Sequence, residues 1–285
     1  MSRVVVTGAS GKIGSALLRE LAEHGYEARA VDVARSPLTD AFPYRRADLR
    51  ELWQAVEVLR GADAVVHLAA VGVPEPEVEQ RALAEQLVFA TNVVSTYNVF
   101  TAAAMVGAKR VVWASSETTM GTPFERTRIS YVPLDEVHPP LPNNTYALSK
   151  AIGEELGRQV GRWTGVTIVG LRLSVVMDAP DYAGLPEHWA DPERGRWNLW
   201  SYVDLRDVVR ACRLALEARV ERSDVCIVAA ADTTMDRPTR ELLAAAMPGL
   251  EPPDDLPQHG SLLSSARASR VLGYVPAHSW RSGRG

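Results

Sequence analysis

The stretch that decides the fold is Thr7-Gly8-Ala9-Ser10-Gly11-Lys12-Ile13-Gly14, which directly follows the apolar run 4–6. Its G-x-x-G-x-x-G pattern lies between an expected strand at 4–7 and an expected helix at 12–23. In this context Gly8 permits a tight turn, Gly11 lets a phosphate approach the backbone, and Gly14 lets helix and sheet pack closely. Free N–H groups at the helix N-terminus attract the anion. The stretch predicts a dinucleotide site formed by Gly8, Ser10, Gly11, Lys12, Ile13 and Gly14.

Outward from this unit, short β-branched runs alternate with amphipathic patterns. We expect strands at 28–33, 64–69, 110–115, 167–173 and 225–229, with helices near 50–59, within 78–106, and at about 145–163 and 204–216. Apolar strands separated by helices indicate a parallel sheet covered on both faces. The chain is therefore predicted to be an α/β protein with a doubly wound Rossmann sheet.

Two stretches interrupt this rhythm. Residues 124–145 contain four prolines, and residues 177–202 are rich in Pro, Asp and Trp without a clear period. Both read as long loops, which in compact domains are usually functional. We expect an NAD-binding core at 1–174 and a substrate loop with a small C-terminal lobe at 175–285, of which 203–229 returns to the sheet. The last 15 residues are expected to be a frayed tail.

Composition narrows the function. The chain has 285 residues, a net charge of −4 and no cluster of Lys and Arg, so we expect a small-molecule partner and no nucleic acid. No apolar run approaches the roughly 18 residues of a membrane span, and Met1 leads straight into a strand, so a cytoplasmic protein without membrane contact is expected. Cys212 and Cys226 read as buried hydrophobes, and no His/Cys cluster has metal-ligand spacing.

The acidic residue at the end of the second strand bears on the choice of cofactor. Asp32 is placed to hydrogen-bond both ribose hydroxyls and to repel a 2′-phosphate, which favours NAD. Arg35 lies close enough to meet a 2′-phosphate, so NADP remains the alternative. Asp48 and Leu49 could contact the adenine ring, although Asp48 could equally be a helix N-cap.

A second constellation carries the chemistry. Tyr146 and Lys150 are four residues apart, hence on one face of one helix. A nearby cation favours the phenolate, so Tyr146 could take a proton from an alcohol as hydride leaves its carbon. Ser116 follows the strand at 110–115, where its hydroxyl can donate to the developing alkoxide. Alone, Tyr-x-x-x-Lys is a common surface pair, but the ordered set is far more specific.

At this point the sequence resembles the extended short-chain dehydrogenase/reductase family, also called NAD-dependent epimerases/dehydratases. Besides TGASGKIG at 7–14 and YALSK at 146–150, the matching pieces are HLAA at 67–70, ASSETTMG at 114–121, LRLS at 171–174, YVDLRDVV at 202–209 and LGYVP at 272–276. The resemblance implies that Ser116 is the catalytic hydroxyl and Tyr146 the acid/base. It implies that Lys150 lowers the pKa of the phenol and holds the nicotinamide ribose.

The resemblance also assigns residues beyond these motifs. It implies that Leu68, Ala69 and Ala70 line the nicotinamide ribose and that Leu173 to Val175 face the carboxamide. Asn92, counted with the cofactor site, and Asp204 are expected to be structural rather than catalytic.

The insert after the LRLS strand bears on the substrate. Nucleotide-sugar enzymes of this family usually have a longer insert than 175–201, so we expect a smaller substrate. The short architecture is similar to that of uronate dehydrogenases, but Glu117-Thr118 replaces their Asn-His pair and Ala183 replaces their carboxylate-binding Arg. Because Glu117 would repel a uronate, a neutral or cationic sugar, polyol or hydroxy compound is predicted. The expected substrate contacts are Val71, Ser116, Glu117, Thr118, Ser174, His188 and Trp189, whereas Trp197 and Trp200 read rather as core.

The family contains several reactions, and three functions are considered. The main hypothesis is an NAD-dependent oxidoreductase that releases NADH. The second is a sugar or nucleotide-sugar epimerase that retains NAD, and the third is a redox-sensing protein that binds NAD(P) without chemistry. Dehydration is disfavoured because only one carboxylate, Glu117, follows Ser116. A homodimer is expected from the resemblance, through the helices starting near Ala90 and Tyr146.

Overall fold

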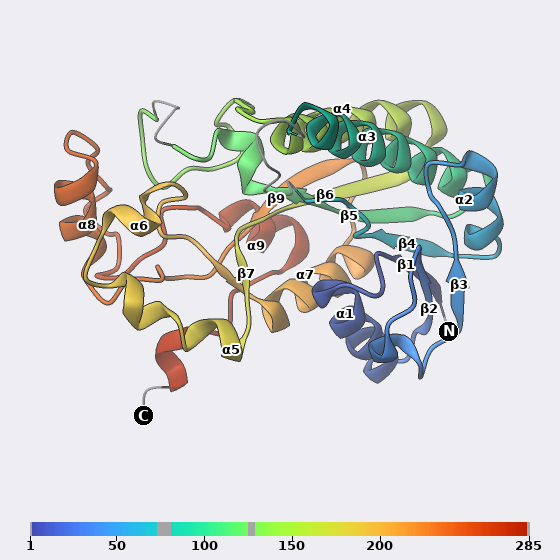
Figure 1. Cartoon of the computed structure of the whole chain (residues 1–285), viewed down its shortest axis with the longest axis horizontal. Coiled ribbons are helices and arrows are strands. Elements are labelled where there is room, and N and C mark those ends of the chain that lie inside the picture. The colour runs from blue at the N-terminus through green and yellow to red at the C-terminus, as the bar shows by residue number, and fades with distance from the viewer. Residues whose placement is uncertain (1, 73–80, 125–128, 284–285) are drawn as a thin grey trace.

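The structure, a computed structural model, describes residues 2–72, 81–124 and 129–283. Its centre is a seven-stranded parallel sheet in the order β3-β2-β1-β4-β5-β6-β9 (Figure 1). This arrangement confirms the doubly wound α/β fold. The strands are β1 (Arg3–Thr7), β2 (Glu27–Asp32), β3 (Tyr44–Arg46), β4 (Ala64–His67), β5 (Arg110–Ser116), β6 (Thr167–Leu173) and β9 (Asp224–Val228).

Helices cover both faces of the sheet, as Figure 1 shows. On one face lie α2 (Leu52–Leu59), α3 (Arg81–Met105) and α4 (Thr145–Thr164), and on the other lie α1 (Lys12–Glu23) and α7 (Leu205–Glu217). Neighbouring side chains of a strand point to opposite faces, so Val4 and Val6 pack with α1 and α7 while Val5 packs with the other layer. Because all strands are parallel, their carboxyl ends share one edge, where open α/β sheets bind ligands.

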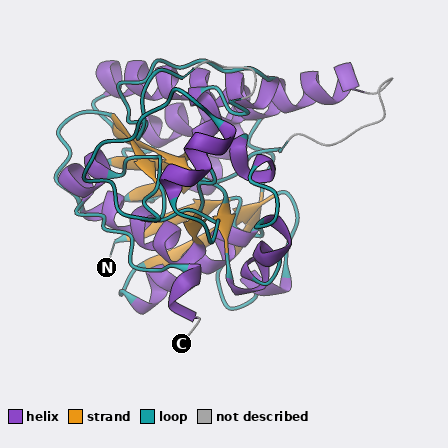
Figure 2. Cartoon of the chain, turned by 90° about the vertical axis from the view of Figure 1, so that its left-hand side faces the viewer, coloured by secondary structure: helices purple, strands orange, loops and turns teal. Residues whose placement is uncertain are grey.

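The connection between β6 and α7 is a compact insert rather than an irregular loop. It contains β7 (Val176–Met177), α5 (Ala179–Tyr182), η4 (Leu185–His188) and α6 (Glu193–Arg196), and returns through β8 (Val203–Asp204), which pairs with β7. Each helix is about one turn long, too short to leave a periodic pattern in the sequence. Figure 2 shows these short helices and loops in front of the sheet.

The C-terminal segment contradicts the expected frayed tail. After α8 (Thr239–Ala246) and α9 (Ala266–Leu272) the chain ends its described part in η5 (Trp280–Gly283). Trp280 is only 6% exposed, its indole N–H donates to the Thr233 carbonyl at 2.8 Å, and its ring lies 5.3 Å from that of Trp189. Burial of one large aromatic side chain holds the segment against the insert.

The core agrees with the expected roles of the cysteines. Cys212 and Cys226 are free and buried, and burial raises the pKa of both thiols to about 12. Within the described ranges, no group of three or more His, Cys, Asp or Glu side chains could hold a metal ion. The proposed division of the chain at residue 174 stays a prediction, although β9 does return to the sheet.

One helix of the described part is long and apolar enough to cross a membrane by length and composition. It lies within α3, at Ala82–Met105, where an 18-residue window has a mean hydropathy of 1.2. Half of this window is buried, and Val99 and Phe100 of the helix belong to the hydrophobic core. The core helix of a globular protein has the same composition, so the hydropathy of α3 is weak evidence for a membrane.

Candidate active site

The glycine turn between β1 and α1 is shaped by close backbone contacts. Gly8 has a φ of +69°, and a Cβ there would lie 2.6 Å from the Ala69 nitrogen. A Cβ on Gly14 would lie 2.2 Å from the Gly8 carbonyl oxygen. At Gly11, the N-cap of α1, the nearest atom would be 3.4 Å away. The fold thus requires Gly8 and Gly14, whereas Gly11 leaves room that a pyrophosphate can use.

A groove runs from this turn along the carboxyl ends of β1, β2 and β4. Eight of the residues expected around the cofactor line it, namely Gly8, Gly11, Asp32, Asp48, Leu49, Leu68, Ala69 and Ala70. Val71, which was expected beside the substrate, lies in the same groove. Val33, Ala47, Arg50, Thr91 and Ser95 complete the lining, and no motif had indicated them. The groove matches in position and chemistry the adenosine half of a dinucleotide.

The end of β2 favours NAD. The Asp32 carboxylate accepts hydrogen bonds from the backbone N–H groups of Ser10 at 2.9 Å and Val33 at 2.7 Å, which fix it at the rim of the groove. Arg35 forms an ion pair with Asp40 at 2.9 Å and lies over the Tyr44 ring at 5.5 Å. With its charge already paired, Arg35 is poorly available for a 2′-phosphate, which Asp32 would also repel.

Asp48 has a different local role from the proposed N-cap. Its carboxylate accepts bonds from the Arg50 backbone N–H at 3.0 Å and from the Arg50 guanidinium at 2.6 Å, which holds the pKa of Asp48 below its usual value. The N-cap of α2 is Glu51, so the N-cap alternative for Asp48 is wrong.

The side chains of Lys12 and Ile13 point away from the expected phosphate site. Lys12 forms ion pairs with Asp178 and Asp181 at the start of the insert. The side chain of Ile13 packs against the hydrophobic core. Their backbone N–H groups at the first turn of α1 still face the expected anion site, because the first N–H groups of a helix lack intrahelical partners.

Asn92 and His67 hold the backbone that follows β4. The Asn92 amide accepts from the Val71 N–H at 2.8 Å and donates to the Val71 carbonyl at 3.0 Å, so Asn92 shapes the groove without lining it. His67 lies between the hydroxyls of Thr7 at 2.7 Å and Thr96 at 3.3 Å. Burial, with the charge of Lys150 nearby, lowers the pKa of His67 to about 3, so its imidazole is neutral. Both residues are structural.

Ser116, Tyr146 and Lys150 come together at the carboxyl end of β5. The Lys150 ammonium is 5% exposed, donates to the Ala114 carbonyl at 2.7 Å and lies 5.5 Å from the centre of the Tyr146 ring. Burial lowers the pKa of Lys150 to about 8. Burial raises the pKa of the Tyr146 phenol above its ordinary 10, and a hydrogen bond with Ser116 opposes this rise. A hydroxyl donor thus acts on the phenol directly, and a buried cation lies 5.5 Å from the centre of its ring.

The Ser116 hydroxyl is oriented by the residue two positions later. Its oxygen accepts from the Thr118 backbone N–H at 3.2 Å and from the Thr118 hydroxyl at 3.0 Å. With both lone pairs used in this way, the hydroxyl hydrogen of Ser116 is left to point toward Tyr146 or a substrate oxygen. Thr118 therefore acts on Ser116 rather than facing an open pocket. Leu173 lies beside Ser116 in the sheet register, and Val175 opens the insert by accepting from the Val203 N–H at 2.9 Å.

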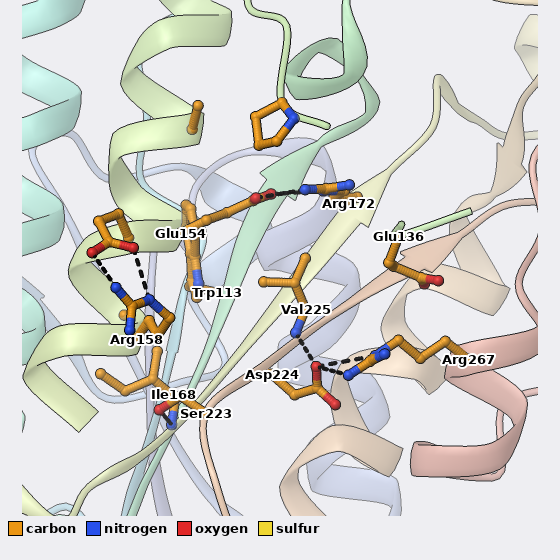
Figure 3. A pocket seen from close by; sticks show the side chains of 14 residues that line it. Trp113, Glu136, Glu154, Arg158, Ile168, Arg172, Ser223, Asp224, Val225 and Arg267 are labelled. Atoms are coloured by element: carbon orange, nitrogen blue, oxygen red, sulfur yellow. Dashed lines mark hydrogen bonds and ion pairs between the residues drawn. The ribbon is translucent and has the colours of Figure 1, made fainter. Parts of the chain in front are cut away.

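Behind this edge, a buried ion pair joins α4 to β6. Glu154 accepts from Arg172 at 2.9 and 2.8 Å and from the Ser115 hydroxyl at 2.5 Å. Figure 3 shows Glu154 and Arg172 pointing toward each other across a pocket that Arg267 and Asp224 close on its other side. The lining of this pocket includes none of Ser116, Tyr146 and Lys150. Its ion pair supports the catalytic edge from behind.

Glu117 does not face an open substrate pocket, contrary to expectation. It is 3% exposed, and its two carboxylate oxygens accept from the Ser174 hydroxyl at 2.6 Å and from the Asn198 amide at 3.1 Å. Burial raises the pKa of Glu117 to about 7, against the opposing effect of these two hydrogen bonds. Ser174, also expected to contact substrate, is 4% exposed and turned toward Glu117. Both expected contacts are therefore corrected to an internal pair.

The aromatic residues of the insert are anchors. Trp189 donates its indole N–H to the Thr234 carbonyl at 3.0 Å and packs on Trp280, so its expected role in substrate contact is corrected. His188 is exposed at the end of η4. Trp200 is fully buried and donates to the Pro192 carbonyl at 2.7 Å, which confirms its core role. Trp197 is half-buried.

Sequence reasoning missed the residues that act across long separations. Asn198 is 81 positions from Glu117, and Glu154 is 18 positions from Arg172. Glu154 stands beside Glu155 and near Lys150 and Arg158 in the sequence, so nothing marks it as the acid with a buried partner. Asn198, within a Trp-rich insert, likewise carries no signal.

With this geometry in place, comparisons with known proteins can be stated. The NAD dependent epimerase/dehydratase family matches residues 4–190. The chain is 30% identical over 226 residues to an NAD-dependent glucose-6-phosphate dehydrogenase of Haloferax volcanii, covering 73% of this chain and 79% of that one. It is 27% identical to an L-arabinose 1-dehydrogenase (NAD(P)(+)) of the same organism, covering 80% and 87%. The expected likeness to uronate dehydrogenases is also found, at 25% identity over 190 residues (66% of this chain and 64% of that one) to that of Pseudomonas syringae.

A solved structure corrects one earlier argument. The UDP-glucose 4-epimerase of Thermus thermophilus in complex with NAD has a TM-score of 0.68 and 25% identity to this chain, covering 99% of this chain and 96% of that one. The extent of the chain therefore does not separate sugar from nucleotide-sugar enzymes. The family match covers well over half of the residues, and the glycine turn and the Ser116, Tyr146 and Lys150 set lie within it. The chain belongs to the NAD-dependent epimerase/dehydratase family and is an NAD-dependent enzyme.

Proposed function

We propose that the protein is a sugar dehydrogenase that oxidises a hydroxyl carbon of a small neutral sugar or polyol and releases NADH. The observation that carries this proposal is the buried Ser116, Tyr146 and Lys150 set at the end of β5. The groove with Asp32 at its rim extends from the glycine turn to Ala70 and Val71, on the segment that follows β4. Such a complete set does not support the third hypothesis, a redox sensor without chemistry.

The residues divide the work of alcohol oxidation. NAD, when bound, supplies the hydride acceptor. We assign the pyrophosphate to the backbone at Gly11 and the adenosine ribose to Asp32. Ser116 donates a hydrogen bond to the substrate oxygen, and Tyr146 takes the hydroxyl proton as a general base. Protonated Lys150 favours the phenolate of Tyr146 and keeps hydrogens free for ribose hydroxyls, since only one bond is made to Ala114.

The charge near Ser116 supports a substrate without carboxylate or phosphate. Glu117 follows Ser116 directly, is buried, and has no basic side chain among the causes of its pKa shift. In its ionised form, which a pKa of about 7 leaves only partly populated at neutral pH, this carboxylate would repel an anion bound near Ser116, whereas a neutral hydroxyl avoids that repulsion. Of the named relatives, one acts on L-arabinose, which is neutral. Neutral pentoses and hexoses are therefore the substrates to test first.

The test is a substrate panel followed by NADH absorbance. L-arabinose, D-xylose, D-galactose and D-glucose represent neutral sugars, and glucose 6-phosphate and galacturonate represent anionic ones, each with NAD and with NADP. Turnover with NAD should be at least about tenfold higher for a neutral sugar than for either anion, as a repulsion of about 1.4 kcal/mol predicts. Preference for an anionic sugar would refute the charge argument while leaving the dehydrogenase chemistry intact.

The second candidate is an epimerase that retains NAD. The likeness to a UDP-glucose 4-epimerase over almost its whole length favours it. The two candidates differ in cofactor exchange, because an epimerase regenerates its NAD in each cycle. Protein purified without added cofactor should be free of NAD for the dehydrogenase and should carry NAD for the epimerase, as measured by absorbance after denaturation.

We also propose a homodimer formed through α3 and α4, which lie side by side (Figure 1). Exposed apolar side chains recur on α3 at spacings of four, seven, three and eight residues, which keeps them near one face of the helix, at Leu83, Leu87, Val94, Tyr97 and Met105. Leu87→Glu should convert a dimer to a monomer in light scattering. A monomeric wild type would refute this assignment.

The cellular setting follows from the cofactor. NAD-dependent oxidation of small sugars and two free buried thiols suit a reducing compartment, so we place the protein in the cytoplasm. The partners proposed are its sugar substrate and a second copy of the chain, rather than nucleic acid or a membrane.

A further inference from the structure

The contact between Glu117 and Asn198 joins two functional parts of the molecule. Glu117 begins the turn η3 (Glu117–Met120), directly after the catalytic Ser116. Asn198 lies near the end of the insert, 81 positions later. The Asn198 amide donates both to Glu117 at 3.1 Å and to the Ser201 carbonyl at 2.8 Å, so it fixes the insert backbone and the carboxylate at once.

The turn of the insert that follows Asn198 has a strained backbone and depends on contacts with the rest of the protein. Leu199 and Trp200 have φ values of +59° and +54°, a left-handed conformation that side chains with a Cβ rarely adopt. Both residues are fully buried. Strained backbone of this kind persists only where the surrounding structure determines it. The Thr234 N–H bonds the Trp200 carbonyl at 2.9 Å on one side, and Asn198 bonds Glu117 on the other.

Ser174 completes the connection. It follows β6 at the start of the insert, and its hydroxyl donates to the second oxygen of Glu117 at 2.6 Å. One carboxylate thus receives bonds from both ends of the insert. Residues 174 and 198 enclose nearly the whole segment that packs over the catalytic edge.

We propose that Glu117 is a positioning residue whose carboxylate fastens both ends of the insert to the strand end that carries Ser116, and so sets the wall of the sugar site. This role differs from direct substrate contact, because both oxygens of Glu117 are occupied by protein donors. Its kinetic consequence rests on the proposed function. The expected signature is weaker sugar binding with the cofactor site and the chemistry left in place.

The state of the carboxylate matters for this connection. In the structure both oxygens of Glu117 accept hydrogen bonds, which is the arrangement of an ionised carboxylate. The pKa of about 7 arises from burial, opposed by the bonds from Ser174 on the β6 side and Asn198 on the insert side, and no charged side chain of the described residues contributes. Below pH 7 burial favours the neutral acid and the fold as a whole gains stability, but the hydrogen bonds from Ser174 and Asn198 lose their charged acceptor, so the hold on the insert weakens.

Kinetics with L-arabinose and NAD test the proposal in Glu117→Gln, Asn198→Ala, the double variant and the control Glu193→Gln, an exposed acid of the same insert. Glu117→Gln and Asn198→Ala should each raise the KM for L-arabinose about tenfold, the size of one lost hydrogen bond to a charged group. The KM for NAD should stay within about twofold and kcat within about threefold of wild type. The effect of the double variant should be smaller than the product of the two single effects, because the two substitutions share the Glu117–Asn198 contact.

The pH profile adds a readout that a general loss of stability would not give. The wild-type KM for L-arabinose should rise as the pH falls through 7, and in Glu117→Gln it should be high and flat over that range. Hydrogen exchange at residues 195–201 should speed up in Glu117→Gln and not in Glu193→Gln. This second measurement needs no substrate, so a protein that oxidises no sugar of the panel refutes the proposed function without deciding the role of Glu117.

Three results would overturn the proposal. The first is a Glu117→Gln variant that matches the control in both KM and hydrogen exchange. The second is a double variant in which the effects of the two single variants multiply. A loss of kcat at unchanged KM would make Glu117 a participant in the chemistry instead. Should Glu117→Gln fail to fold, Ser174→Ala removes one donor from the same carboxylate and is expected to raise the KM for L-arabinose alone.

Discussion

The cofactor groove and the insert are held in place by opposite means. The groove is built from backbone: Gly8 and Gly14 approach neighbouring main-chain atoms so closely that a Cβ would clash. The insert is held by side chains that reach across the fold, such as Asn198 to Glu117 and Trp189 to Trp280. A site built from backbone requires particular residue types at fixed spacings in the sequence. A site built from side-chain contacts requires only that the two residues of each contact match. Cofactor chemistry can thus stay constant while the substrate wall changes.

The largest expected effect lies in the catalytic set. Tyr146→Phe removes the proton acceptor and leaves the ring packed beside Lys150, so kcat should fall by about 10³-fold. NAD affinity, measured by fluorescence titration, should stay within about twofold of wild type. Equal losses of NAD binding and turnover would show that Tyr146 builds the groove instead of acting in the reaction.

Within the groove, substitutions of two glycines should separate the stability of the fold from the binding of NAD. Gly14→Ala places a Cβ 2.2 Å from the Gly8 carbonyl and should destabilise the protein by about 1–3 kcal/mol in denaturant unfolding. Gly11→Ala meets nothing closer than 3.4 Å, so stability should hold while NAD affinity falls by about tenfold, because the methyl occupies the expected pyrophosphate approach. A matching loss of stability in both variants would contradict this division.

On the insert side, pH should reveal the buried carboxylate. The pKa of Glu117 is raised from 4.5 to about 7, so the folded state binds the proton more tightly than the unfolded state. Its contribution is favourable below about pH 4.5 and is lost as the pH rises through 7. Relative to Glu117→Gln, wild type should lose about 3 kcal/mol of unfolding free energy between pH 4 and pH 8. Parallel pH curves for the two proteins would mean that Glu117 is not buried as an acid.

The smallest effect is expected at the exposed attachment of the insert. Lys12 pairs with Asp178 and Asp181, but its side chain is 39% exposed. Water screens such pairs, so Lys12→Ala should change the unfolding free energy by less than about 1 kcal/mol. A larger loss of unfolding free energy, comparable with that of a buried contact, would mean that the insert is held mainly by Lys12 of the glycine turn and not by Glu117.

These differences explain what the sequence could predict. The strands, the helices α1 and α4, Asp32 and the catalytic set follow patterns of period, spacing or order, and the structure brings them together. Glu117 was noticed because a charge beside a catalytic serine is conspicuous. Its burial could not be foreseen, since the partner Asn198 is set by a strained turn at Leu199 that no local pattern encodes.

The C-terminal segment teaches the same lesson from another side. A stretch with Ser, Arg and Gly reads as a tail, yet Trp280 finds a partner in Trp189, 91 positions away in the chain. Burial of an aromatic side chain depends on what the remainder of the fold presents to it. The sequence carries the side chain but not the surface that receives it.

The most direct test of the account is the stoichiometry of one reaction. Cofactor-free wild type with L-arabinose and excess NAD should form one NADH for each sugar oxidised, and Tyr146→Phe should form almost none. The account would be contradicted by a wild type that retains NAD through purification, forms no net NADH with any sugar of the panel, and interconverts UDP-glucose and UDP-galactose.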